Sequence, residues 1–190
     1  MRTLLFSLVV LGLSGYTASS SRAADTYALD PGHFGVNFKI SHLGLSWTYG
    51  RFNKAEGTFI LDPANPARSS FSFTVHVDSL DTNSKQRDDH LRSPDFFNAK
   101  QFAKITFVST AVRPVNGGYE VTGDLTLHGV THPLTLQLLG GKTAEFPKGT
   151  LRTGFTTDLV LKRTTFGMDK MTEAIGDDVH ISISFEGTRQ

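Results

Sequence analysis

VHISISFEG, residues 179–187, alternates between apolar and polar side chains. In an extended chain, Val179, Ile181, Ile183 and Phe185 share one face, and the residues between them share the other. A period of two residues is typical of a β-strand that buries one face and exposes the other, as strands of antiparallel sheets do. The stretch therefore predicts an antiparallel β protein.

Three further stretches show the same alternation, and weaker ones bring the number of candidate strands to about nine. The clear ones are VNFKISH (36–42), FSFTVHVD (71–78) and YEVTGDLTL (119–127); the weaker ones span 45–52, 54–62, 103–110, 132–139 and 151–161. Turn-forming residues separate them at 62–66, 114–118 and 140–141. So many antiparallel strands either stack as a sandwich or close as a barrel, and alternation alone does not choose between the two.

The N-terminus has the three parts of a secretory signal peptide. Arg2 precedes an apolar run from Leu4 to Leu13, and Ser21-Arg22-Ala23 is a small-x-small cleavage site. The apolar run is too short to span a bilayer. We therefore predict a signal peptide at residues 1–23, a single domain at residues 24–190, and an exported, periplasmic protein that does not span the membrane.

Composition narrows the function classes. The formal charge is +1, and without Arg2 and Arg22 the remaining chain is close to −1, so a nucleic-acid partner is not expected. The chain has no cysteine, which excludes disulfides, thiolate metal sites and cysteine nucleophiles. Stability must come from a packed core, and 15 phenylalanines are a plausible source of one.

Residues 83–102 break the alternation and predict a short helical insert lying across the sheet. Asn83 or Ser84 can cap a helix that ends near Leu91, and Ser93-Pro94 is typical of the start of a second helix. Asp88 and Asp89 are placed to pair with Arg92 at helical spacing, and Leu91, Phe96 and Phe97 form the apolar side.

No catalytic or metal site is predicted. Asp88, Asp89 and His90 are adjacent on a helix and point in different directions, and His128 with His132 need further ligands. Neither a GxSxG nor an HExxH motif is present. For Arg87, Asp89 and Arg92 a salt-bridged helix face is favoured over a polar rim that holds an anionic or carbonyl head group. The aromatic side chains on the strands leave two options open: a filled core, or a barrel with a lumen for one apolar ligand.

Six blocks resemble, in order and spacing, the YceI-like family. They are DPGHFGVNFKISHLG (30–44), GRFNKAEGTFILDP (50–63), RDDHLRSPDFFNAKQFAKITF (87–107), VTGDLTLHGVTHPLTL (121–136), RTGFTTDLVLKRTTFGM (152–168) and GDDVHISISFEG (176–187). The resemblance runs from about Tyr27 to Glu186, and RDxHLRSxDFF together with LTxHGVTxPL is its most specific part. It implies an extended antiparallel, lipocalin-like β-barrel of about eight strands, exported to the periplasm and often dimeric.

The resemblance also implies an elongated apolar cavity for a polyisoprenoid, either a polyprenyl lipid or a ubiquinone-type chain, with no enzymatic activity and no other cofactor. Roles in isoprenoid carriage, storage or stress tolerance follow from the same resemblance. The residues we expect to bind the ligand come from the inward faces and the insert, with His90 and Arg92 near the polar end. They are Phe38, Ile40, His42, Trp47, Phe52, Phe73, Val75, His90, Leu91, Arg92, Phe96, Phe97, Phe107, Leu125, Leu127, Phe155, Phe166 and Ile183.

Trp47 and Tyr49 stand where related sequences usually carry polar residues, so these two aromatics either narrow the cavity mouth or offer a stacking surface for a quinone ring. Two rival functions stay open. One is an enzyme acting on an isoprenoid or quinone, with His42 or His90 as acid or base beside a carboxylate. The other is a secreted protein with a filled core that works through its surface.

Overall fold

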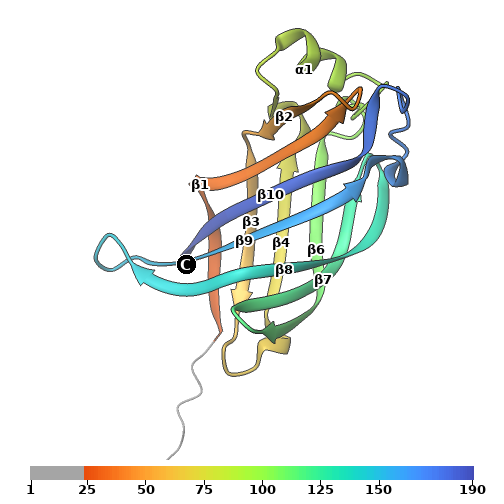
Figure 1. Ribbon diagram of the computed structural model, residues 1–190. Helices are drawn as coiled ribbons and strands as arrows, with labels where there is room; N and C mark the ends of the chain where they lie inside the picture. Colours follow the sequence, from red (N-terminus) through yellow and green to blue (C-terminus); the bar gives the residue numbers. More distant parts are fainter. Residues whose placement is uncertain (1–23) are drawn as a thin grey trace, which may run out of the picture.

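β-Strands make up most of residues 24–190, the part of the chain that the computed structural model describes (Figure 1). The predicted signal peptide lies outside these residues. Four of the strands fall on the clearly alternating stretches. The strands are β1 (Asp25–His42), β2 (Ser46–Phe52), β3 (Ala55–Leu61), β4 (Ser70–His76), β5 (Leu80–Asp81), β6 (Lys104–Val115), β7 (Gly118–Leu127), β8 (Val130–Glu145), β9 (Leu151–Lys162) and β10 (Ile175–Arg189). The helical elements are α1 (Lys85–Leu91) and the short 3-10 helices η1 (Pro66–Arg68), η2 (Val77–Ser79) and η3 (Arg163–Phe166).

Pairing between the last strand and the first closes the sheet into a barrel. β10 runs antiparallel to β1, with Val36 opposite Ile183, and the ring continues through β9, β8, β7, β6, β4 and β3 back to β1. β2, which precedes β3 in the chain, pairs with the second half of β1. The two-residue strand β5, which follows β4, pairs with β2. The prediction of an eight-stranded antiparallel barrel is therefore confirmed, and a sandwich is excluded.

One end of the barrel is filled by aromatic rings from five strands. Tyr27 stacks on Phe59 at a centroid distance of 5.1 Å, and Phe59 stacks on Phe71 at 5.5 Å. Phe155 and Phe185 meet the Phe59 ring edge-on, at centroid distances of 6.0 and 5.7 Å. All five side chains are buried. Burying a phenylalanine contributes roughly 1.5–3 kcal/mol, so this aromatic cluster stabilises and closes its end of the barrel.

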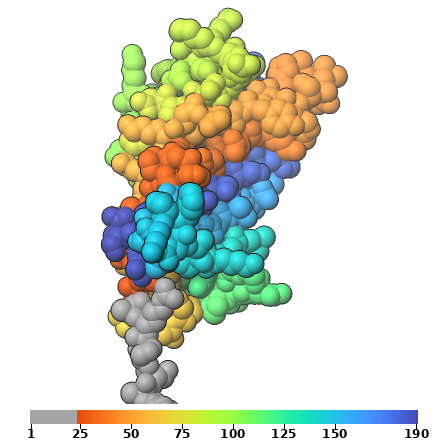
Figure 2. Space-filling view, turned by 90° about the vertical axis from the view of Figure 1, so that its left-hand side faces the viewer, coloured from red at the N-terminus to blue at the C-terminus, as the bar shows by residue number. Residues whose placement is uncertain are grey.

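The helical insert forms within residues 83–102 as predicted, but it lies at the other end of the barrel and not across the sheet (Figure 1), and it holds a single α-helix. Ser84 is the N-cap of α1, and its side chain accepts a hydrogen bond from the Arg87 N–H. The second predicted helix does not form: the chain from Ser93 onward makes turns, and Asn98 adopts a left-handed backbone with φ of 46° that ends any helix there. Figure 2 shows α1 in yellow-green at the top, with the orange hairpin between β1 and β2 projecting beside it.

No helix within residues 24–190 is long and apolar enough to cross a membrane.

Candidate functional site

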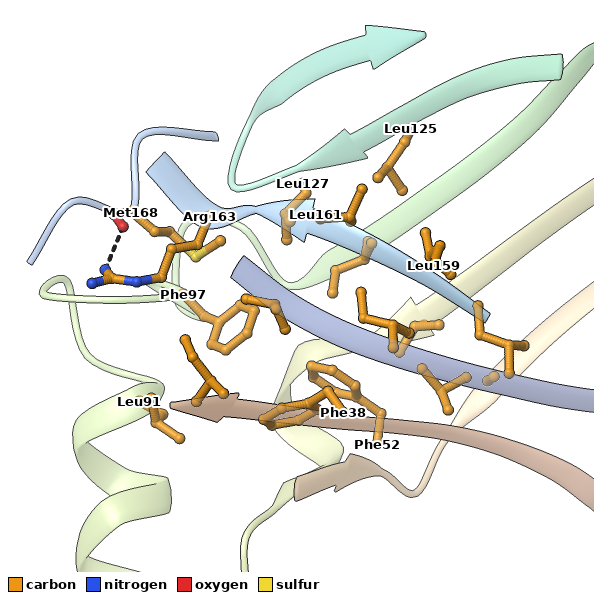
Figure 3. A pocket seen from close by; sticks show the side chains of 18 of the residues that line it. Phe38, Phe52, Leu91, Phe97, Leu125, Leu127, Leu159, Leu161, Arg163 and Met168 are labelled. Atoms are coloured by element: carbon orange, nitrogen blue, oxygen red, sulfur yellow. Dashed lines mark hydrogen bonds between the residues drawn. The ribbon is translucent and has the colours of Figure 1, made fainter. Parts of the chain in front are cut away.

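The half of the barrel nearest α1 contains a cavity of about 720 Å³ (Figure 3). Its wall consists of inward-facing aliphatic and aromatic side chains, because alternate residues of every strand face the lumen. In Figure 3, Leu125, Leu127, Leu159 and Leu161 point into it from the strands on one side. The volume lies within the range of sites that hold one small ligand, roughly 300–1,000 Å³.

The two halves of the barrel differ in how tightly their inward side chains pack. Ile40, Val75, Leu159, Ile181 and Ile183 face inward and yet stay partly accessible, whereas the inward-facing phenylalanines of the aromatic cluster are buried. An eight-stranded barrel is just wide enough either to be filled by side chains or to hold one small ligand. The protein therefore leaves an oily space open at one end and fills the other.

The mouth of the cavity is polar and lies at the α1 end. His42, Gln86, Arg87, His90 and Met171 line the cavity and are exposed. A shallow outer hollow adjoins the mouth and shares Phe38, His42, Thr48 and Arg87 with the cavity. It lies along the edge of β2, which pairs with β5 only at Arg51 and Phe52. The cavity is therefore continuous, at these shared residues, with a hollow between β2 and the start of α1.

Gly50 on β2 permits the close packing of this wall. It pairs with Phe38 on β1, and a Cβ at position 50 would lie 2.3 Å from the Phe38 ring. Any side chain there would displace the ring. The Phe38 ring instead lies beside Gly50 and contacts the Phe52 ring at a centroid distance of 5.8 Å.

Thr82 anchors α1 over the mouth. The buried Asp88 carboxylate accepts hydrogen bonds from the Thr82 N–H at 2.9 Å and from its hydroxyl at 2.6 Å. The Arg87 guanidinium donates to the Thr82 hydroxyl oxygen at 2.8 Å and to its carbonyl at 2.6 Å. Arg92 donates to the carbonyls of Asp78 and Leu80. These bonds hold the helix in one position relative to β5.

Arg163 organises the loop on the opposite side of the mouth. Its buried guanidinium donates to the carbonyls of Met168 at 2.6 Å, Lys170 at 2.8 Å, Gly176 at 2.9 Å and Ile175 at 3.0 Å (Figure 3). Burial lowers the pKa of the group below its usual value because desolvation penalises the charged form. The four carbonyl contacts fix residues 167–176 against the barrel rim.

Comparison with known proteins identifies the fold family. A sequence model of the YceI-like domain matches residues 27–187. The chain belongs to the YceI-like family. Protein YceI of Escherichia coli is 40% identical to it over 177 residues, which cover 92% of each chain.

Two solved structures share the barrel. The crystal structure of BcnA from Burkholderia cenocepacia has a TM-score of 0.72 at 27% identity and covers 83% of this chain and 98% of its own. A polyisoprenoid binding domain from Saccharophagus degradans has a TM-score of 0.66 at 17% identity, covering 86% of this chain and 98% of its own. The latter likeness shows the fold alone.

Most of the ligand-binding residues expected from the sequence line the cavity of this YceI-like barrel, although their role in binding stays a prediction. They come from the inward faces of six strands, from α1 and from the turns that follow it. They are Phe38, Ile40, His42, Phe52, Phe73, Val75, His90, Leu91, Phe96, Phe97, Phe107, Leu125, Leu127 and Ile183.

Four of the expected residues do not line the cavity. Trp47 pairs with Ser41 in a register that places both on the outer face of the barrel. Arg92 is committed to the carbonyls that hold α1, and Phe155 belongs to the aromatic cluster at the filled end. Phe166 is buried in η3 against the His132 ring at 5.3 Å. Arg92 is therefore not part of the cavity lining, and its head-group role stays a prediction.

Sequence reasoning missed several lining residues. Val179 and Ile181 lie on the same face of the strand as Ile183, so alternation was sufficient to find them. The set Leu134, Leu136, Leu138, Leu159 and Leu161 lies on the weaker strand candidates and follows the same rule. By contrast, Met168 and Met171 reach the cavity from an irregular loop, and no periodic signal in the sequence places them there.

The histidines and acids that were considered as metal or catalytic groups each have a separate partner. Asp89 pairs with Lys85 at 2.5 Å, and one guanidinium nitrogen of Arg92 lies 3.6 Å away from it. His90 Nε2 lies 3.1 Å from an Asp95 carboxylate oxygen, and both side chains are about half exposed. His128 and His132 contact the carbonyls of Phe166 at 3.0 Å and Thr165 at 3.2 Å.

Asp30 forms an ion-pair cluster away from the mouth. It accepts hydrogen bonds from the Gly32 N–H at 2.8 Å, from Arg152 and from His33 at 3.0 Å, and these lower its pKa to about 2. Asp30, His33 and Glu186 bring three potential metal-ligand atoms within 4.8 Å of one another. The guanidinium of Arg152 contacts both carboxylates, so the cluster already contains its counter-ion.

Proposed function

We propose that the protein binds a polyisoprenoid lipid, a polyprenyl or ubiquinone-type chain, in the barrel cavity and carries or sequesters it. The observation that carries this proposal is a hollow apolar lumen that is filled at one end and opens through a polar mouth at the other. Such a site accepts a long hydrocarbon and keeps a polar end near water. The polyisoprenoid binding domain from Saccharophagus degradans, which shares the fold, supports the same ligand class.

Chain burial supplies the affinity under this proposal, and the mouth supplies the selectivity. Each buried methylene contributes about 0.8 kcal/mol, so a prenyl chain has a large driving force of little specificity. Under this proposal, the polar mouth residues His42, Gln86 and His90 meet the head group. Changing them is expected to alter which head group is accepted and to leave hydrocarbon binding largely intact.

We further infer that this binding takes place in the periplasm. The predicted signal peptide supports export, and a soluble barrel can shield a prenyl chain between membranes. A link to stress tolerance follows if the bound lipid is a quinone. Homodimerisation stays a prediction that light scattering on the purified protein tests.

A binding role is proposed in preference to a catalytic one. His90 and Asp95 are the histidine–carboxylate pair at the mouth, and both are about half exposed. An acid–base pair that works on a ligand in an apolar site is usually desolvated, which this pair is not. An extracted lipid that is chemically altered after incubation with the protein would contradict the binding role.

Mass spectrometry of the organic extract from natively purified protein tests the proposal. A prenyl lipid recovered in equimolar amount is the expected result, and its mass gives the chain length and the head group. An extract without prenyl lipid, from protein that also fails to take up added prenyl lipid, would refute it.

A further inference from the structure

The tip of the β1–β2 hairpin presents apolar side chains to water. Leu43 is 55% exposed and Leu45 is 83% exposed. Leu43 has a φ of 54°, a left-handed conformation that bulky residues rarely adopt. Strained backbone of this kind is found mainly at functional sites. The conformation turns an oily side chain outward at a position where glycine or asparagine would be more stable.

A second strained residue lies on the neighbouring loop. Met171 has a φ of 57° and is 45% exposed. The Leu43 N–H donates to the Ala174 carbonyl at 2.7 Å, and the Met171 carbonyl accepts from the Ala174 and Ile175 N–H groups at 3.0 and 2.8 Å. These bonds hold Leu43 and Met171 on the same rim, and Met171 also lines the cavity.

Behind the tip, the hairpin changes from apolar to amphipathic to charged. Trp47 is 43% exposed on the outer face, with the His180 ring edge-on at 5.1 Å and Lys39 Nζ 4.7 Å from the ring centroid. At about 3.4 Å per residue, Trp47 lies roughly 7 Å behind Leu45. This order matches the depth profile of a bilayer surface, with leucines at the acyl boundary, tryptophan at the head groups and lysine above them.

The hairpin also adjoins the mouth of the cavity. His42 and Thr48, on its inner face, line the cavity, while Trp47 lies on its outer face. Figure 2 shows the hairpin projecting from the body of the molecule beside α1. A surface that receives Leu43 and Leu45 therefore lies next to the cavity opening.

We propose that residues 43–47 of the β1–β2 hairpin dock on a phospholipid bilayer, so that a lipid chain passes between the membrane and the cavity at the point of contact. The proposal rests on the lipid-binding function proposed above. A second copy of the chain fits the hairpin less well. A stable protein interface covers about 800 Å² on each partner, whereas a narrow tip inserts into a fluid bilayer without a complementary surface.

The chain provides its own reporter, since Trp47 is its single tryptophan. We expect its emission to shift to the blue on addition of phosphatidylethanolamine–phosphatidylglycerol vesicles and to be quenched when the acyl chains are brominated. Quenching by brominated acyl chains reports insertion of the hairpin that carries Trp47. Vesicle binding by residues 1–23 alone does not give this signal. Unchanged emission with both kinds of vesicle would overturn the docking proposal.

The test variant combines Leu43→Asn with Leu45→Gln and keeps Trp47. Asparagine tolerates the left-handed backbone, so the hairpin is expected to fold. Partitioning into the vesicles should fall at least about tenfold, since two large apolar side chains no longer enter the acyl region. The matched control is Leu139→Gln, a leucine 54% exposed on the outer wall of β8, which should partition as the wild type does.

Each contrary outcome has a clear meaning. Equal quenching in the double variant and the wild type would overturn the role of the leucines. A blue shift that grows with protein concentration in the absence of vesicles would show that a second copy covers the hairpin, and would overturn membrane docking. Quenching by brominated vesicles, from a protein that neither yields prenyl lipid in its extract nor takes up added prenyl lipid, retains docking and removes the carrier role. Prenyl lipid in the extract with unresponsive Trp47 retains the carrier role and removes docking.

Discussion

Leu159→Trp tests whether the cavity is empty where the structure places it. Leu159 faces inward from the middle of β9, opposite Ile181 on β10, and its side chain is partly accessible although it points into the barrel. An indole at this position is expected to extend into the lumen and occupy space that the ligand chain needs.

The magnitudes follow from the volume that the indole takes. Tryptophan is roughly six heavy atoms larger than leucine, and displacing even three ligand carbons at about 0.8 kcal/mol each costs roughly 2.4 kcal/mol of binding. That corresponds to about a 50-fold loss of affinity. The free energy of unfolding of the ligand-free protein should change by less than about 1 kcal/mol, because overpacking costs arise only where the core is already full.

Two measurements on one preparation check this prediction. Competition against a fluorescent prenyl analogue gives the affinity, and urea unfolding of delipidated protein gives the stability. Leu139→Trp, on the outer wall, is the control and should bind as the wild type does. A variant that binds normally, or one that loses more than about 2 kcal/mol of stability, would refute the picture of a hollow lumen at Leu159.

Three further changes probe the groups that shape the mouth and the far end. Asp30→Asn should lower the free energy of unfolding by roughly 1–2 kcal/mol at neutral pH. Because folding lowers the pKa of Asp30 from 3.8 to about 2, the difference in stability between variant and wild type should vanish as the pH falls through this range. Urea unfolding at a series of pH values measures it. Arg163→Met leaves buried carbonyls unsatisfied and should cost roughly 3 kcal/mol, with faster amide exchange in residues 167–176; unchanged exchange there would contradict the clamp. Arg92→Ala should cost about 1–2 kcal/mol and loosen α1 while leaving the extracted lipid unchanged. A change of head-group preference in this variant would instead indicate that Arg92 contacts the head group.

The sequence was most informative where local chemistry decides the structure. Alternation predicted the strands and their inward faces, as in Val75 and Ile183, because successive side chains of any strand point to opposite sides. Ser84 as the N-cap of α1 was predictable for a similar reason, since capping depends on residues close in the chain. The second helix was wrong because Asn98 takes a left-handed turn that its neighbours alone do not specify.

The face of Trp47 was not predictable from its own stretch. Alternation places the large apolar residues Leu45, Trp47 and Tyr49 on one face of residues 45–52 and so favours the wrong face as the inward one. A shift of one residue in the pairing exchanges the two faces. Pairing of Ser41 with Trp47 settled the matter and turned the indole outward. Arg92 and Phe166 do not line the cavity for a related reason: their partners, Leu80 on β5 and His132 on β8, are not neighbours in the sequence.

The amino-acid sequence by itself determined that the chain forms an antiparallel wall with one oily side, because side-chain alternation is a property of each strand alone. Only the tertiary structure decided which half of that wall stays hollow. Phe59, Phe71, Phe155 and Phe185 come from four strands and meet across the barrel, whereas Leu159 and its neighbours line the cavity. Whether two side chains touch across a lumen depends on the diameter of the closed sheet, and that diameter exists only once the last strand has paired with the first.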